Sequence, residues 1–196
     1  MERQRTVGEY RAIDLLIFSL MVFFGETVII MGARLFPGEL YVLSVTPVVT
    51  AIVMMRWGPW AAIHAALGGL ALCIGTGAAA QQYAVYCGGN LLGLGALALL
   101  KLQGKENIRQ DAFRTVVFGL ATALLMQLGR ALASVALGGP AEAMFEFFRA
   151  DVLTLLFTAV VIAIVRRLDG VFEDQINYLL RISKEREEER ENSDEG

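Results

Sequence analysis

The sequence predicts an all-α, polytopic membrane protein with six transmembrane helices and an amphipathic cytoplasmic C-terminal helix, and three observations support this fold class. Of the 196 residues, 56% are hydrophobic, and the mean hydropathy of +0.54 is too high for a soluble domain of this length. Apolar runs long enough to cross the roughly 30 Å hydrocarbon core of a bilayer recur along the chain. Lys and Arg residues gather in alternate connections between these runs, as they do in multi-pass membrane proteins.

The six predicted spans follow one another with short connections. Pro37 and Gly38 end the first span, and Pro47 predicts a kink or tilt in the second. In the third span small residues recur at every fourth position, which allows another helix to approach closely. The fourth contains Gly89 and Gly93 as a GxxxG pair. The predicted spans cover residues 13–33, 41–55, 60–78, 83–100, 113–137 and 148–165, within a transmembrane domain of residues 13–167 that follows a cytoplasmic N-terminus of residues 1–12.

The basic residues predict the orientation of the chain. One side of the predicted membrane domain carries only Arg34 and Arg149, whereas the other side carries ten Lys and Arg residues. The positive-inside rule places the basic side in the cytoplasm, so both termini are expected there, in a bacterial-type plasma membrane. The ten residues are Arg3, Arg5, Arg11, Arg56, Lys101, Lys105, Arg109, Arg114, Arg166 and Arg167.

Residues 168–196 lie beyond the last span and divide into two parts. Apolar residues recur at helical spacing between Leu168 and Ile182 in an otherwise charged segment, which predicts an amphipathic cytoplasmic helix over residues 168–184. Residues 185–196 are mostly acidic and polar, a composition typical of a disordered tail. Two interpretations of the helix stay open: it lies along the membrane surface, or it docks or dimerises.

Arg130 lies inside the fifth span, and Gln127 precedes it by three residues. An arginine within a membrane span costs about 2.5 to 3.5 kcal/mol on insertion scales, so it requires a partner or water. In the predicted orientation, Glu26, Asn90 and Asp151 lie in the same outer half of the bundle as Arg130. The polar side chains of several helices are therefore expected to converge there.

Two interpretations of these polar residues compete. In the first, Arg130 pairs with Glu26 or Asp151, because buried membrane charges usually pair with one another, and the pair fixes helix packing. In the second, a cavity open to the outside holds a small polar solute on the same groups. We favour the cavity, because the polar groups outnumber those that a single ion pair needs.

The sequence lacks the motifs of the common catalytic families. It has no HExxH, GxSxG or P-loop motif, so we expect neither an enzyme nor a bound cofactor or metal, and we expect no nucleic-acid partner. Cys73 and Cys87 form no CxxC and are expected to be packing residues. His64 is expected to be an interfacial or packed histidine that hydrogen-bonds locally. Without a P-loop, uphill transport would require a partner or an ion gradient.

Six spans with short loops, cytoplasmic termini and a polar cluster in the outer half resemble the S components of energy-coupling factor (ECF) vitamin transporters. The resemblance covers residues 13–167. It implies that the protein captures a micronutrient from outside and associates, in the lipid bilayer, with a transmembrane coupling subunit and cytoplasmic ATPases. It also implies a pocket lined by Glu26, Tyr41, Tyr86, Asn90, Gln127, Arg130, Arg149 and Asp151.

A non-transporting membrane module is the alternative function. A scaffold, or a sensor that passes a signal onward through the helix predicted over residues 168–184, accounts better for the amphipathic C-terminal segment. It accounts less well for the outer polar cluster, unless the module senses a ligand. An enzyme is supported only by a possible cluster of Glu26, Arg130 and Asp151.

Overall fold

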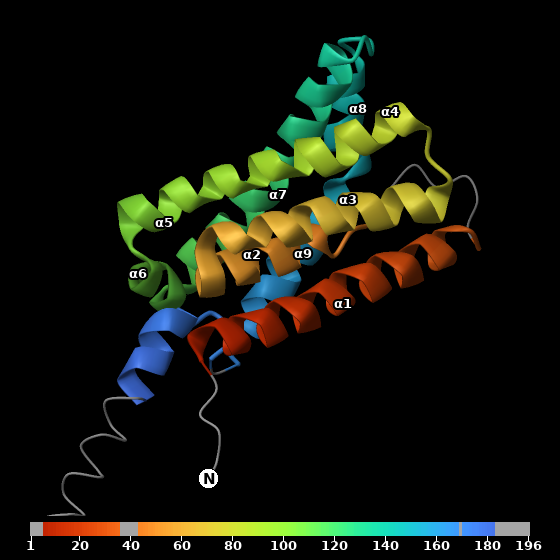
Figure 1. Cartoon of the computed structure of the whole chain (residues 1–196). Helices are drawn as coiled ribbons and strands as arrows, with labels where there is room; N and C mark the ends of the chain where they lie inside the picture. The colour runs from red at the N-terminus through yellow and green to blue at the C-terminus, as the bar shows by residue number, and fades with distance from the viewer. Residues whose placement is uncertain (1–5, 36–42, 169, 183–196) are drawn as a thin grey trace, which may run out of the picture.

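The computed structural model describes residues 6–35, 43–168 and 170–182, and 85% of it is helix with no strand in those ranges (Figure 1). The longest helices are α1 (Val7–Ala33) and α7 (Ala112–Ala136). The other helical segments, in chain order, are α2 (Thr46–Trp57), the 3-10 helix η1 (Gly58–Ala61), α3 (Ala62–Thr76), α4 (Ala80–Tyr83), the π-helical turn η2 (Ala84–Gly88), the 3-10 helix η3 (Leu91–Ala96), α5 (Leu97–Gln103), α6 (Lys105–Gln110), α8 (Ala143–Ala150) and α9 (Val152–Val165).

Four helical stretches are long and apolar enough to cross a membrane. A fifth is counted if Met144–Ala150 and Val152–Val165, which are bent by 47° at their junction, form one broken span. Four or five such stretches suggest a membrane protein, but the six predicted spans are not confirmed. The difference arises at the predicted second and third spans, which belong to a single helical stretch. The four stretches are Val7–Ala33, Thr46–Thr76, Ala80–Gln103 and Ala112–Ala136.

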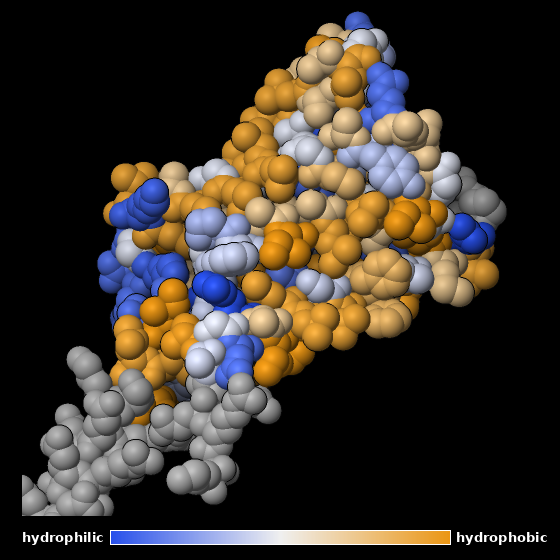
Figure 2. All heavy atoms as spheres, viewed as in Figure 1, coloured by the Kyte–Doolittle hydropathy of each residue, from blue (hydrophilic) through white to orange (hydrophobic). Residues whose placement is uncertain are grey.

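The surface of the bundle is strongly apolar. Large hydrophobic residues such as Leu16, Phe24 and Val28 of α1 and Leu156 of α9 are exposed. Figure 2 shows hydrophobic side chains over most of the visible face, with hydrophilic side chains gathered at the end where α5 and α6 lie. An exposed apolar surface of this extent indicates contact with a membrane or with another protein.

Helix α2 is the enclosed centre of the fold. Every residue of α2 except Arg56 is buried, because α1, α3, α7 and α9 pack around it. Gly58, with a positive φ of 61°, ends α2 and lets the chain turn back into η1 and α3, which lies alongside α2. Pro47 lies in the first turn of α2, where proline starts a helix and does not kink it. With 12 residues, α2 is about 18 Å long and is shorter than the hydrocarbon core of a bilayer.

Two carboxylates of α1 hold the two ends of α2. At the N-terminal end, Glu26 Oε1 accepts hydrogen bonds from the Ser44 hydroxyl (2.5 Å), the Thr46 hydroxyl (2.6 Å) and the Thr46 backbone N–H (3.0 Å). At the C-terminal end, the Asp14 carboxylate accepts two hydrogen bonds from the Arg56 guanidinium, at 2.7 and 2.9 Å. The 12 positions between Asp14 and Glu26 span about 18 Å of α1, which matches the length of α2. Helix α1 therefore fixes α2 along its axis.

Asp14→Ala is expected to lower the free energy of unfolding by about 2 to 3 kcal/mol, because hydrogen bonds to charged groups contribute about 1.5 to 3 kcal/mol each and part of that loss is recovered from water. Arg56 and the Trp57 indole, whose Nε1–H donates to Asp14 at 2.5 Å, both lose their acceptor. Denaturation in mild detergent measures the change. Glu142→Ala, at an exposed position outside the bundle core, is the matched control and should leave stability unchanged.

Glycines bring neighbouring helices into close contact, as the sequence predicts. A Cβ added to Gly129 of α7 would lie 2.0 Å from the carbonyl oxygen of Gly89. A Cβ on Gly69 of α3 would lie 2.6 Å from the carbonyl carbon of Tyr86. Only glycine permits backbones to approach this closely. The two contacts hold the segment from η2 to η3 between α3 and α7.

His64 and the two cysteines behave as packing residues. His64 is fully buried, and its Nε2–H donates to the carbonyl oxygen of Leu15 in α1 at 3.1 Å. This confirms the prediction of a packed histidine with a local hydrogen bond. Cys73 is buried, Cys87 is half-buried, and both are free thiols.

A buried side chain, a hydrogen bond and an ion pair attach the C-terminal segment to the bundle. Residues 175–182 are helical, whereas residues 170–174 form turns, so the helix predicted over 168–184 is not confirmed in that form. Phe172 is buried, and Arg56 Nη1 donates to the carbonyl oxygen of Gly170 at 2.7 Å. Lys105 forms an ion pair with Asp174. The tail predicted for residues 185–196 lies outside the described residues.

Candidate solute-binding site

Arg130 is buried in the bundle and joins three helical segments. The residue is 4% exposed, and its Nη1 donates to Asp151 Oδ2 at 2.8 Å. Its Nε donates to Asn90 Oδ1 at 2.7 Å, and Asn90 Nδ2 donates in turn to the carbonyl oxygen of Ala65 in α3 at 2.9 Å. Arg130 therefore pairs with Asp151, which is one of the two pairings that the ion-pair interpretation allows.

The aromatic ring of Tyr86 lies close to the guanidinium of Arg130. The ring centroid of Tyr86 lies 5.4 Å from Arg130 Cζ, which is within cation–π distance. The ring of Phe147, from α8, meets the Tyr86 ring edge to face at 6.3 Å. Tyr86 lies in the π-helical turn η2, and such turns are frequent at functional sites because they widen a helix locally.

Asp151 stands at the junction of α8 and α9, where the chain bends by 47°. Its backbone N–H donates to the carbonyl oxygen of Phe147 at 3.2 Å, and its own carbonyl oxygen accepts from the Leu155 N–H at 3.1 Å. Asp151 therefore ends one helix and begins the next. Its carboxylate forms the ion pair with the Arg130 guanidinium at 2.8 Å. Discontinuous helices of this kind occur at the binding sites of transporters.

Gln127 lies one helical turn before Arg130 on the same side of α7. It is 1% exposed, and neither its amide oxygen nor its amide nitrogen hydrogen-bonds to any residue that the structure describes. Leaving a buried polar group unpaired costs about 1 to 3 kcal/mol. The hydroxyls of Thr50 in α2 and Thr158 in α9 are likewise buried without a partner in the described ranges. Helix α7 therefore presents a donor and an acceptor that the described protein does not use.

The structure brings several of the predicted site residues together and leaves others apart. Glu26 is buried, but its hydrogen bonds go to residues 44–46 at the start of α2 and not to Arg130. Arg149 is exposed on α8, and its predicted place in the pocket stays a prediction. Tyr41 lies outside the described residues. Arg130 contacts Tyr86, Asn90 and Asp151, and these four residues, together with Gln127 one helical turn away on α7, are here called the Arg130 cluster.

Sequence reasoning missed Phe147, which packs against the cluster, and the residues that hold the two ends of α2. Phe147 precedes Asp151 by four residues, a spacing that puts two side chains on one helix face and could have been recognised. Ser44 and Thr46 stand at the start of α2, and hydroxyl residues just before an apolar run are typical of a helix N-terminus. Asp14 is an acid within the first apolar run, which signals a charged partner. That partner is Arg56.

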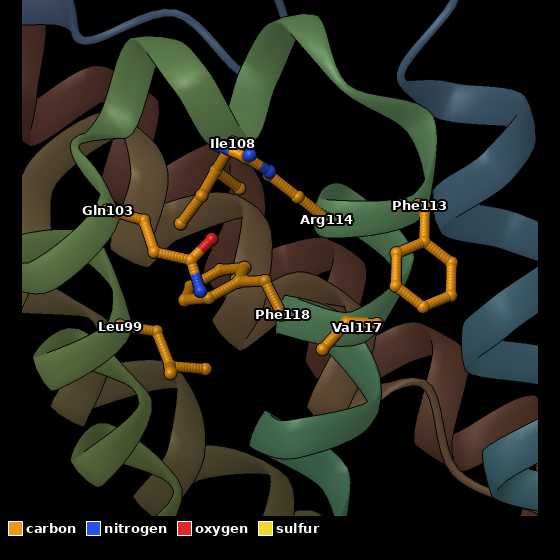
Figure 3. Close-up of a pocket in the computed structure, with 7 residues that line it drawn as sticks. All are labelled: Leu99, Gln103, Ile108, Phe113, Arg114, Val117 and Phe118. Carbon is orange, nitrogen blue, oxygen red and sulfur yellow. The ribbon is translucent and has the colours of Figure 1, made fainter.

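The Arg130 cluster is closed to solvent in this structure, since Arg130 and Asp151 are each 4% exposed. The cavity that the sequence predicts is therefore not open at this position. A cavity of about 360 Å³ lies at the other end of α7, between α5, α6 and α7 (Figure 3). Its lining residues are Leu99, Gln103, Ile108, Phe113, Arg114, Val117 and Phe118.

The groups available in the Arg130 cluster are a guanidinium, a carboxylate, two amides and a phenol. Among the described residues, no group of three or more His, Cys, Asp or Glu side chains is arranged to hold a metal ion. No family model, curated protein or solved structure shows significant similarity to the chain. Hydrogen bonding, charge pairing and ring stacking are the chemistry that the cluster offers.

Proposed function

We propose that the protein is the substrate-capture membrane subunit of an ECF-type micronutrient importer and binds a small polar solute at the Arg130 cluster. The observation that carries the proposal is Gln127, whose buried amide makes no hydrogen bond within the described chain. A purely structural ion pair between Arg130 and Asp151 has no need of this amide. A solute with a matching donor and acceptor would satisfy it and recover the cost of its burial.

The composition of the Arg130 cluster favours a particular class of solute. Arg130 and Asp151 offer both signs of charge, and the rings of Tyr86 and Phe147 offer stacking surfaces. A zwitterionic or aromatic micronutrient fits these groups. Entry requires the closed cluster to open, and the bend at Asp151 is where α8 would move relative to α9. Such a movement would carry Phe147 away from Tyr86.

In this proposal, helices α2 and α3 are the second and third of six membrane spans, and both termini lie in the cytoplasm of a bacterial-type plasma membrane. Because the sequence contains no P-loop, energy for import would come from cytoplasmic ATPases acting through a transmembrane coupling subunit. The strongly apolar exposed surface leaves room for such a subunit beside the lipid.

Affinity purification of the tagged protein from its native membranes, in mild detergent, tests the partners. We expect two ATPase subunits and one further membrane protein to copurify in constant ratio. We expect the same proteins with Gln127→Leu, because this variant changes only the solute site. If cross-linked membranes also yield the protein alone, the importer assignment is wrong, whether or not the Arg130 cluster binds a solute.

A sensor is the second candidate function, and a chain of contacts favours it. The cytoplasmic segment at Gly170 is bound by Arg56 at one end of α2, and Glu26 near the Arg130 cluster binds the other end. A change at the cluster could therefore move α2 and the C-terminal segment together. Truncation after Arg167 removes the C-terminal segment that Arg56 binds at Gly170. A sensor would lose its output but keep its solute, whereas a capture subunit would keep both solute binding and uptake.

A further inference from the structure

The cavity between α5, α6 and α7 is separate from the Arg130 cluster. Arg114 at this cavity and Arg130 are 16 positions apart in α7, which corresponds to about 24 Å. Its floor consists of the buried side chains Ile108 and Phe118, and Leu99 and Val117 form its walls (Figure 3). The lining is therefore mostly apolar, and Gln103 and Arg114 supply its polar groups.

The mouth of the cavity lies among side chains suited to contact with lipid. Phe113 at the mouth is 76% exposed, and Leu102, next to the lining residue Gln103, is 81% exposed. Large apolar residues this exposed are stable in a membrane and unfavourable in water. An occupant with an apolar chain would therefore reach the cavity from the bilayer.

Basic side chains gather at the end of the bundle where the cavity lies. Between residues 101 and 114 the chain carries Lys101, Lys105, Arg109 and Arg114 against Glu106 and Asp111, and Figure 2 shows hydrophilic side chains gathered at this end. Arg166 adds a further cation, because its Nη2 donates to the carbonyl oxygen of Gln110 at 3.1 Å.

Arg114 is the cation that lines the cavity itself, and its side chain extends across the cavity toward Ile108 in Figure 3. Its ion pair with Asp111, at 3.4 Å, joins two half-exposed side chains and contributes little. The Asp111 carboxylate is also engaged by the backbone N–H groups of Phe113 and Arg114, at 2.8 and 3.3 Å. The Arg114 guanidinium is therefore available to an anion.

We propose that this cavity binds one anionic phospholipid, with an acyl chain between α5 and α7 and the phosphate on Arg114. Apolar clefts between membrane helices with basic side chains at their cytoplasmic end take up acidic lipids in this way. A zwitterionic lipid has the same acyl chains and would fill the apolar part, so preference for the acidic lipid distinguishes the site from general lipid contact. The proposal does not depend on the solute bound at the Arg130 cluster.

Native mass spectrometry with added lipid tests the proposal. The delipidated full-length protein is mixed with equal amounts of phosphatidylglycerol and phosphatidylcholine of identical acyl chains, and the retained lipids are counted. We expect one phosphatidylglycerol to be retained preferentially. Arg114→Gln should reduce this preference about fivefold, which corresponds to the loss of one cation near a lipid headgroup. Val117→Trp, which fills the cavity, should abolish retention of both lipids at this site.

Arg149→Gln is the matched control, because it removes an exposed arginine at the opposite end of the bundle. It should keep the wild-type preference, and all variants should elute as the wild type does in size-exclusion chromatography. Equal retention of the two lipids by the wild type would overturn the proposal. Loss of the preference in Arg149→Gln with its retention in Arg114→Gln would also overturn it.

Discussion

Asp151→Ala is expected to lower the free energy of unfolding by about 3 to 5 kcal/mol, because it leaves a buried arginine without its carboxylate. Arg130 and Asp151 are paired at 2.8 Å and are almost fully buried. The remaining hydrogen bond from Arg130 to Asn90 is to a neutral amide and does not compensate a charge. Thermal and chemical denaturation in mild detergent measure the loss.

Two further variants separate the charge from the general effect of mutating this region. The double variant Arg130→Met with Asp151→Ala removes both charges and should recover a large part of the lost stability. Arg149→Ala, an exposed residue two positions from Asp151, should change stability by no more than about 0.5 kcal/mol. If the double variant is as unstable as Asp151→Ala, the unpaired buried charge is not the cause of the lost stability.

Gly129→Ala is expected to destabilise the bundle by about 3 kcal/mol, at the upper end of the cost of overpacking. Its Cβ would lie 2.0 Å from the carbonyl oxygen of Gly89 and 2.7 Å from the Cβ of Leu92. Both obstacles are at or next to the backbone, so α7 and η3 must move apart. That movement would also lengthen the hydrogen bond from Arg130 to Asn90. Denaturation in mild detergent measures the loss of stability.

Gly88→Ala is the matched control for the glycine contact. Gly88 is exposed and lies next to Gly89 in the chain, but a Cβ added to it would meet nothing within 4 Å. Alanine also has a higher helix propensity than glycine, so this variant should be as stable as the wild type or more stable. A Gly129→Ala variant with the stability of Gly88→Ala would show that the two backbones are not in contact.

The sequence predicts α1 and α7 well, because long apolar runs bounded by charges define such helices. The predicted ranges 13–33 and 113–137 compare with Val7–Ala33 and Ala112–Ala136. Helix α2 is different, since a helix that is apolar on all sides can face either lipid or other helices. Only the tertiary structure shows that four helices enclose α2. Its shortness also follows from Gly58, which ends it.

The candidate site was partly accessible to sequence reasoning. A buried arginine requires a partner, and this rule reduced the choice to Glu26 or Asp151. The rule could not decide between them, because Glu26 binds the backbone of α2 and only the fold reveals this. The bend at Asp151, next to the exposed Arg149, is not visible in a pattern of apolar residues. The cavity near Arg114 arises from the packing of α5, α6 and α7, and no sequence motif marks it.

The central claim is that the Arg130 cluster binds a solute, and native mass spectrometry of the wild type and Gln127→Leu tests it most directly. Both proteins are purified in the same mild detergent, and their melting temperatures are measured after the solute has been removed. We predict that the wild type carries a copurified small molecule and that Gln127→Leu lacks it, although the variant is at least as stable, because leucine removes an unpaired buried amide. A wild type without any small molecule, or a variant that still retains it, would contradict the claim.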